Sequence, residues 1–180
     1  MKNNATRGKV PAKKAALAKK AAPKKKVQPI PAGYGTVTPY LSVRGAAQSI
    51  EFYKKAFGAK ELMRMPGPDG KLGHAEIKIG DSRVMLSDEY EAIAFLSPQS
   101  RGGTTVHIHL YVKDVDATVA RATAVGAKLT RPVQDQFYGD RTGSIEDPFG
   151  HLWHIATHKE DLSMAELKRR AEKAVKAGSG

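Results

Sequence analysis

Cysteine is absent from this chain of 180 residues, which excludes disulfide bonds, thiolate metal sites and a cysteine nucleophile. Long apolar runs are also missing, since none approaches the ~18–20 residues that a membrane-spanning helix needs. The N-terminus lacks the apolar centre of a secretory signal. We therefore expect a cytoplasmic protein without a membrane partner. The length suits one domain, or two small halves that share a core.

Acidic residues are missing from the start of the chain. Residues 1–28 contain ten Lys or Arg and no Asp or Glu, whereas the remainder holds 20 basic and 18 acidic side chains. Because like charges repel and little apolar surface offsets the entropy of ordering, residues 1–33 are predicted to be a disordered basic tail. Two interpretations stay open for residues 1–28: non-specific contact with nucleic acid, or a solubilising extension.

The rest of the chain shows one order of elements twice. Hydrophobic periodicity predicts a strand, a helix and three further strands in a module at about 34–88, and again in a module at about 104–158. The segments F-G-A-K-E-L at 57–62 and V-G-A-K-L-T at 125–130 take the same place in each module. A linker with proline and glycine lies between them, at 88–104.

Helix signals divide the chain further. Apolar spacing predicts a helix at about 46–57 that ends at Gly58, and a second helix at about 115–125. The C-terminal end, residues 163–180, begins with a serine and a glutamate in capping-box spacing. This spacing predicts a third helix at about 164–177.

Two predicted strands carry histidines in alternation with apolar residues. The segments 105–112 and 151–157 place His107 and His154 on the face opposite to apolar residues such as Trp153. Two imidazoles that point into one enclosed surface are a common beginning of a metal site.

Several motifs resemble one superfamily. The segments E-D-P-F-G-H-L-W-H-I-A-T-H at 146–158, Y-G-D-R at 138–141, I-E-F-Y-K-K-A-F-G-A at 50–59 and G-H-A-E-I-K-I-G-D-S at 73–82 resemble the vicinal-oxygen-chelate proteins. These include glyoxalase I, bleomycin-resistance proteins, fosfomycin-resistance enzymes and extradiol dioxygenases, and the likeness is closest to the PhnB-like branch. It covers roughly residues 34–162.

The resemblance implies an α+β fold. Two βαβββ modules would form a curved, eight-stranded mixed sheet around a cavity, either within one chain or across a swapped homodimer. We expect a homodimer, and the sequence leaves the location of the cavity open. Fold resemblance does not fix the reaction, because one scaffold can host many chemistries.

The resemblance also implies ligand positions for one divalent ion, of zinc, nickel, manganese or iron. Metal-binding members place ligands on the first and last strand of each module, which here matches His107 and His154. In the first module the matching position is Thr38, a poor ligand. By alternation, Glu76 shares a face with Lys78 and offers a third ligand or a catalytic base. The alternatives are a metal-free polar pocket, with Glu76 in a structural ion pair with Lys78, Arg83 or Arg141, or histidines that only satisfy hydrogen bonds in the core.

Other polar side chains are candidates for binding a ligand. Tyr40 and Tyr111 fall on the same face of equivalent strands, and Tyr138 and Arg141 lie in the Y-G-D-R segment. Arg141 is predicted either to orient an anionic substrate by bidentate contact or to form a salt bridge with Asp140 or Glu146.

Three functions therefore remain. The first is a protein that binds and sequesters or senses a small molecule, with no cofactor. The second is a metal-dependent lyase, isomerase or oxygenase. The third is a module of this fold tethered to nucleic acid by its tail.

Overall fold

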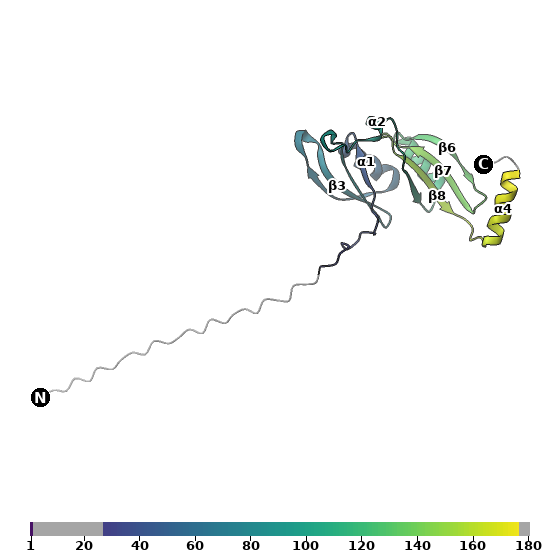
Figure 1. The fold of residues 1–180 in the computed structure, drawn as a ribbon, viewed down its shortest axis with the longest axis horizontal. Coiled ribbons are helices and arrows are strands. Elements are labelled where there is room, and N and C mark those ends of the chain that lie inside the picture. The colour runs from purple at the N-terminus through teal and green to yellow at the C-terminus, as the bar shows by residue number, and fades with distance from the viewer. Residues whose placement is uncertain (2–26, 177–180) are drawn as a thin grey trace.

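The eight strands are divided between two four-stranded sheets, one for each predicted module (Figure 1). The computed structural model describes residue 1 and residues 27–176. Most of the predicted tail, and the last four residues, therefore lie outside the described residues. The α+β class and the two βαβββ modules are confirmed.

The strands follow one another in the same way in both modules. Sheet 1 contains β1 (Tyr40–Val43), β2 (Lys60–Pro66), β3 (Leu72–Ile79) and β4 (Ser82–Asp88), in the order β1-β4-β3-β2. Sheet 2 contains β5 (His107–Tyr111), β6 (Lys128–Asp135), β7 (Asp140–Glu146) and β8 (Leu152–His158), in the order β5-β8-β7-β6. The first strand of each sheet runs parallel to the last, and the other pairs are antiparallel, so both sheets are mixed.

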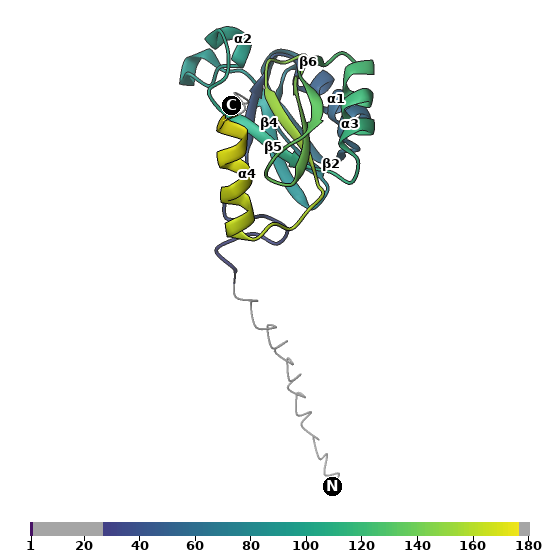
Figure 2. The same ribbon diagram turned by 90° about the vertical axis from the view of Figure 1, so that its right-hand side faces the viewer.

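Two helices cover one face of the sheets. The helices α1 (Ala46–Phe57) and α3 (Val115–Ala124) pack against each other as well as against the strands (Figure 2). We call the opposite faces the outer face of sheet 1 and the outer face of sheet 2. The predicted alternation is confirmed, because Ile77, Ile155 and Trp153 are buried under the helices. A slip of one residue would have turned all three side chains outward.

The ends of α1 are set by residues outside it. Gly45 at its N-terminus has no side chain to cap the helix, so the buried carboxylate of Asp88 accepts the N–H groups of Gly45 and Ala46 at 2.8 and 3.0 Å. The other oxygen of Asp88 accepts the N–H of Leu72 at 2.7 Å. Gly58 ends the helix with a φ of 67°, which favours glycine.

The remaining elements are short turns and a C-terminal helix. They are η1 (Pro68–Gly70), η2 (Glu91–Ile93), α2 (Pro98–Arg101) and α4 (Met164–Lys176). Ser163 accepts the N–H of Glu166 at 3.2 Å, as its spacing predicted. None of the residues of α4 is buried, and the helix stands on the side away from α1 and α3 (Figure 2). Among the described residues, no helix is long and apolar enough to cross a membrane.

Asp147 joins the two modules inside the core. Its buried carboxylate accepts the hydroxyl of Tyr53 from α1 at 2.7 Å and the indole N–H of Trp153 from β8 at 2.9 Å. It also accepts the backbone N–H groups of Phe149 and His151, both at 2.9 Å. Four donors satisfy a charge that would otherwise be costly to bury.

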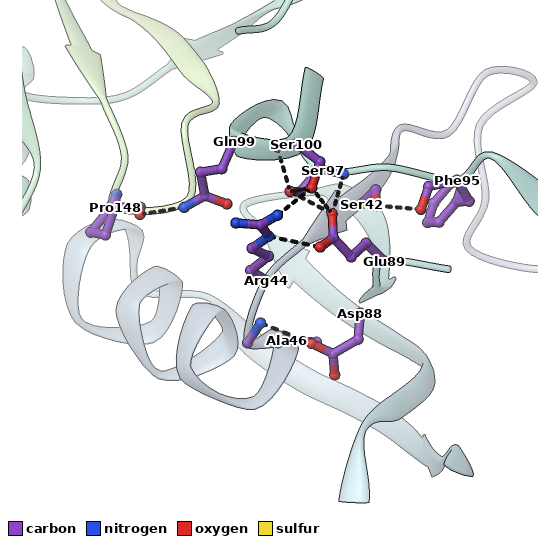
Figure 3. A network of polar contacts seen from close by, with 11 residues as sticks. Ser42, Arg44, Ala46, Asp88, Glu89, Phe95, Ser97, Gln99, Ser100 and Pro148 are labelled. Carbon is purple, nitrogen blue, oxygen red and sulfur yellow. Dashed lines mark hydrogen bonds and ion pairs between the residues drawn. The ribbon is translucent and has the colours of Figure 1, made fainter. Parts of the chain in front are cut away.

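The linker between the modules is held by a partly buried carboxylate, that of Glu89 (Figure 3). Glu89 accepts hydrogen bonds from the guanidinium of Arg44, from the backbone and hydroxyl of Ser97, and from the hydroxyl of Ser100. Burial raises the pKa of Glu89, but the bonds from Ser100, Arg44 and Ser97 outweigh it and lower this pKa to about 2. The network fixes the start of α2 against the end of β1.

Candidate functional site

The outer face of sheet 2 brings together two of the predicted histidines. His107 on β5 and His154 on β8 lie with Nδ1 and Nε2 2.7 Å apart, and their rings are 4.8 Å apart at the centroids. The Nδ1 atom of His154 lies 2.7 Å from the hydroxyl of Ser144 on β7. Three neighbouring strands therefore supply one polar group each to a connected set.

The surroundings of His154 favour the neutral form of its imidazole. Partial burial, followed by the repulsion of positive charge at His107, His109 and Arg131, lowers the pKa of His154 below its ordinary value of 6.5. A neutral imidazole can bind a metal or share a hydrogen bond with a ligand.

The donor set does not fit a catalytic metal within one chain. Two nitrogens bound to one tetrahedral ion at ~2.1 Å would lie about 3.4 Å apart, whereas these two are at hydrogen-bonding distance. Among residues 27–176, no three His, Asp or Glu side chains gather as metal ligands. Asp88, the last residue of β4, is occupied with capping α1.

Glu76 lies in the other sheet and does not meet the histidine pair. It is buried on the outer face of sheet 1, where the guanidinium of Arg83 donates to it at 2.8 Å. Hydrogen bonds from Tyr34, His74 and Arg83 lower the pKa of Glu76 although burial opposes them. The predicted triad therefore does not form within one chain, and the alternative, an ion pair with Arg83, is present.

Tyr40 is placed beside Glu76 through a residue that the sequence reasoning did not select. The Tyr40 hydroxyl lies 2.9 Å from Nδ1 of His74, and Nε2 of His74 lies 3.4 Å from Glu76. The sequence did contain a sign of this contact, because His74 and Glu76 are two positions apart in β3 and therefore lie on the same face of the strand.

Tyr111 and Tyr138 lie on the surface of the second module. The Tyr111 hydroxyl donates to the buried carboxylate of Asp140 at 2.8 Å, and this bond raises the pKa of Tyr111. His158 contacts the other oxygen of Asp140 at 2.7 Å. Tyr138 is 40% exposed and packs against Phe137 in the turn before β7.

Arg141 is already paired. Its guanidinium donates two hydrogen bonds to Asp116 of α3, at 2.7 and 2.8 Å, and one to Asp135 of β6 at 3.1 Å. These carboxylates raise the pKa of Arg141. These contacts tie α3 to sheet 2, and the partners of Arg141 are Asp116 and Asp135 instead of the predicted Asp140 or Glu146.

A cleft of about 1090 Å³ lies where the two modules meet. Its lining comes mainly from the segment before β1, the turn between β3 and β4, β5 and α3. It includes Tyr34, Arg83, His109, Tyr111 and Arg121. Of the predicted ligand-binding residues, only Tyr111 lines this cleft. The His107–His154 pair and the Tyr40–Glu76 group lie outside it, on the open outer faces.

Comparison with known proteins decides the family. The sequence profile of the Glyoxalase/Bleomycin resistance protein/Dioxygenase superfamily matches residues 34–155. The chain belongs to this superfamily. The match ends inside β8, before α4.

Relatives extend this result. An uncharacterised protein of Mycobacterium tuberculosis strain H37Rv is 45% identical over 135 residues, which cover 73% of this chain and 79% of that protein. TioX from Micromonospora sp. ML1 is 26% identical, with a TM-score of 0.54 over 72% of this chain and 100% of its own. The PhnB protein of Bacillus cereus is 16% identical, with a TM-score of 0.54 over 68% of this chain and 99% of its own, a likeness of fold.

Proposed function

We propose that this member of the glyoxalase superfamily binds a small molecule on the outer faces of its sheets. The observation that carries the proposal is that both faces hold organised but accessible polar groups. His107, His154 and Ser144 form one connected set, and Tyr40 ends the other with 44% of its surface exposed. Polar groups that are held in fixed positions orient a ligand in its site.

The cavity is proposed to form between two copies of the chain. Because α1 and α3 pack against each other, the outer faces of the two sheets of one chain do not enclose a common space. In a symmetric dimer, the outer face of sheet 1 from one chain would cover the outer face of sheet 2 from the other. Such an arrangement gives two equivalent cavities and buries Tyr40 and Tyr111, which are exposed in the single chain.

A metal-dependent lyase, isomerase or oxygenase is the weaker candidate. The lowered pKa of His154, which lies beside His107, favours it, because a metal binds the neutral imidazole. Catalytic zinc, however, usually takes three protein ligands, and one chain provides two here. In the dimer, Glu76 of the second copy would have to leave Arg83 to become the third.

A thermal-shift screen of small metabolites tests the binding function. A compound at a hundred times its Kd raises the free energy of unfolding by about 2.7 kcal/mol, which is a shift of several degrees. The shift should be lost in His154→Ala and kept in His158→Ala, a variant that removes an imidazole from the end of the same strand. If His154→Ala keeps every shift, the histidine pair is not part of the site.

The charge of the N-terminal segment supports a second proposal, that residues 1–28 contact nucleic acid. This segment lies almost entirely outside the described residues, and the proposal rests on its ten cations without an acidic residue. Contact would be to phosphates, with a salt slope no steeper than roughly −9. A duplex-DNA titration at several salt concentrations should show binding by the full chain and not by a chain starting at residue 29. Equal affinity of the two forms would leave the segment as a solubilising extension.

A further inference from the structure

A chain of hydrogen bonds on the outer face of sheet 1 ends at an exposed hydroxyl. Tyr40 contacts Nδ1 of His74 at 2.9 Å, and Nε2 of His74 contacts one oxygen of Glu76 at 3.4 Å. Arg83 holds the other oxygen of Glu76 at 2.8 Å. Glu76 is only 6% exposed and Tyr40 is 44% exposed, so the group runs from a buried charge to the surface.

The carboxylate sets the direction of these hydrogen bonds. An ionised Glu76 can only accept, so the Nε2 atom of His74 must carry the proton of their hydrogen bond. In a neutral imidazole the other nitrogen is then an acceptor. With a single proton on the ring, at Nε2, the Nδ1 atom accepts the hydroxyl proton of Tyr40. The proton of the Tyr40 hydroxyl is then engaged, and the exposed oxygen can only accept a further hydrogen bond.

The surroundings of this acceptor are apolar and adaptable. The strand register places Tyr40, Met85, Glu76 and Met63 in one row across the sheet, because each is the partner of the next. Met65 is the partner of His74 in the neighbouring row. Thioether side chains are polarisable and pack well against aromatic rings. The ring of Phe95 lies 5.1 Å from that of Tyr40 and extends the apolar wall.

We propose that the outer face of sheet 1 selects an uncharged ligand that carries a hydroxyl group on an aromatic or similarly apolar body. The ligand hydroxyl donates to the Tyr40 oxygen, and the body packs against Met63, Met85 and Phe95. A ligand of the same shape that can accept but not donate a hydrogen bond cannot form this bond with the Tyr40 oxygen. The inference rests on the proposed function, because it assigns a class of ligand to one of the two outer faces on which that function depends.

Phenol and anisole are probes that differ in the hydroxyl proton. The five methionines allow the measurement, because Met63, Met65 and Met85 lie on this face while Met1 and Met164 lie elsewhere. Protein labelled with ¹³C at the methionine methyl groups is titrated with each compound. Phenol should shift the three signals with a Kd about three- to tenfold lower than that of anisole, the effect of one hydrogen bond.

Two variants assign the difference to Tyr40. Tyr40→Phe should make the two compounds bind equally, whereas Thr123→Val, which removes a hydroxyl from α3 on the opposite side of the sheets, should leave the difference unchanged. In addition, ¹⁵N spectra should show the Nε2–H tautomer of His74.

Several results would overturn the inference. These are equal affinities in the wild-type protein, a difference that persists in Tyr40→Phe, an Nδ1–H tautomer, or no shift of the three signals at millimolar phenol. The proposed function fails separately, when no compound of the thermal-shift screen stabilises the protein.

Discussion

Replacing Glu89 by glutamine should destabilise the protein in a way that depends on pH. The pKa of Glu89 is about 2 in the folded protein against an ordinary value of 4.5, and each unit corresponds to 1.36 kcal/mol. The upper limit for the charge is therefore about 3 kcal/mol. Arg44, which supplies part of the effect, has a side chain that is 56% exposed, so solvent screening reduces the expected loss to about 2 kcal/mol.

The sign of the pH dependence follows from the lowered pKa. Ionised Glu89 stabilises the folded state fully above about pH 5, and this stabilisation is lost as the pH falls from about 4.5 to about 2. The free-energy difference between the wild-type protein and Glu89→Gln should therefore be largest at neutral pH and shrink in acid. Glu91→Gln, an exposed glutamate two residues further on, is the matched control.

Urea unfolding followed by the fluorescence of Trp153, the single tryptophan of the chain, measures these free energies. Glu91→Gln should change the free energy of unfolding by less than about 0.5 kcal/mol. A difference for Glu89→Gln that is equally small at pH 7, or that stays constant down to pH 3, would refute the reasoning.

Three further predictions follow from single contacts. Asp147→Asn places an amide NH₂ group or a weaker acceptor against the donors of Tyr53 and Trp153. The free energy of unfolding, measured in urea, should fall by about 2–4 kcal/mol. A fall of less than about 1 kcal/mol would contradict this prediction. Gly139→Ala places a Cβ 2.6 Å from the carbonyl oxygen of Glu160 and should lower the free energy of unfolding by about 2 kcal/mol or more. Gly70→Ala, where the φ is also positive but the space is open, should lower it by about 1 kcal/mol. Equal losses in the two variants would refute the close contact. Hydrogen bonds to Asp140 and Asp161 raise the pKa of His158 above 6.5, so its contribution to stability is complete below pH 6.5 and is lost as the pH rises through the folded value. A titration by NMR should show this value falling in Asp140→Asn, and an unchanged value would exclude Asp140 as its cause.

The alternation of apolar and polar residues along each strand was enough to predict which face of the sheet a side chain lies on. Ile155 and Trp153 are buried, and His107 and His154 meet on the opposite face, because alternation along a strand is fixed by backbone geometry. The helix at 46–57 was predicted with its observed bounds, since its apolar spacing and its terminal glycine agree.

This alternation could not predict which faces of the two sheets lie near each other. Glu76 does point outward from its sheet, but the two sheets are separate and the helices lie between the modules, so it does not reach the histidine pair. Arg141 forms ion pairs with Asp116 and Asp135, which are 25 and 6 positions away in the sequence, because the tertiary packing places α3 and β6 beside it. Such partners depend on the three-dimensional arrangement, which local pattern does not contain.

A mixing experiment tests most directly the central claim, that each ligand cavity is built from the outer faces of two chains. Tyr40→Ala damages sheet 1 and His154→Ala damages sheet 2, and each variant alone should bind poorly the compound that gives the largest shift in the thermal screen. After subunit exchange of an equal mixture, mixed dimers hold one cavity with both changes and one with neither. Calorimetric titration should then recover about a quarter of the wild-type number of sites, at the wild-type affinity. If the mixture recovers no sites although exchange is complete, the cavities lie within single chains and the claim is wrong.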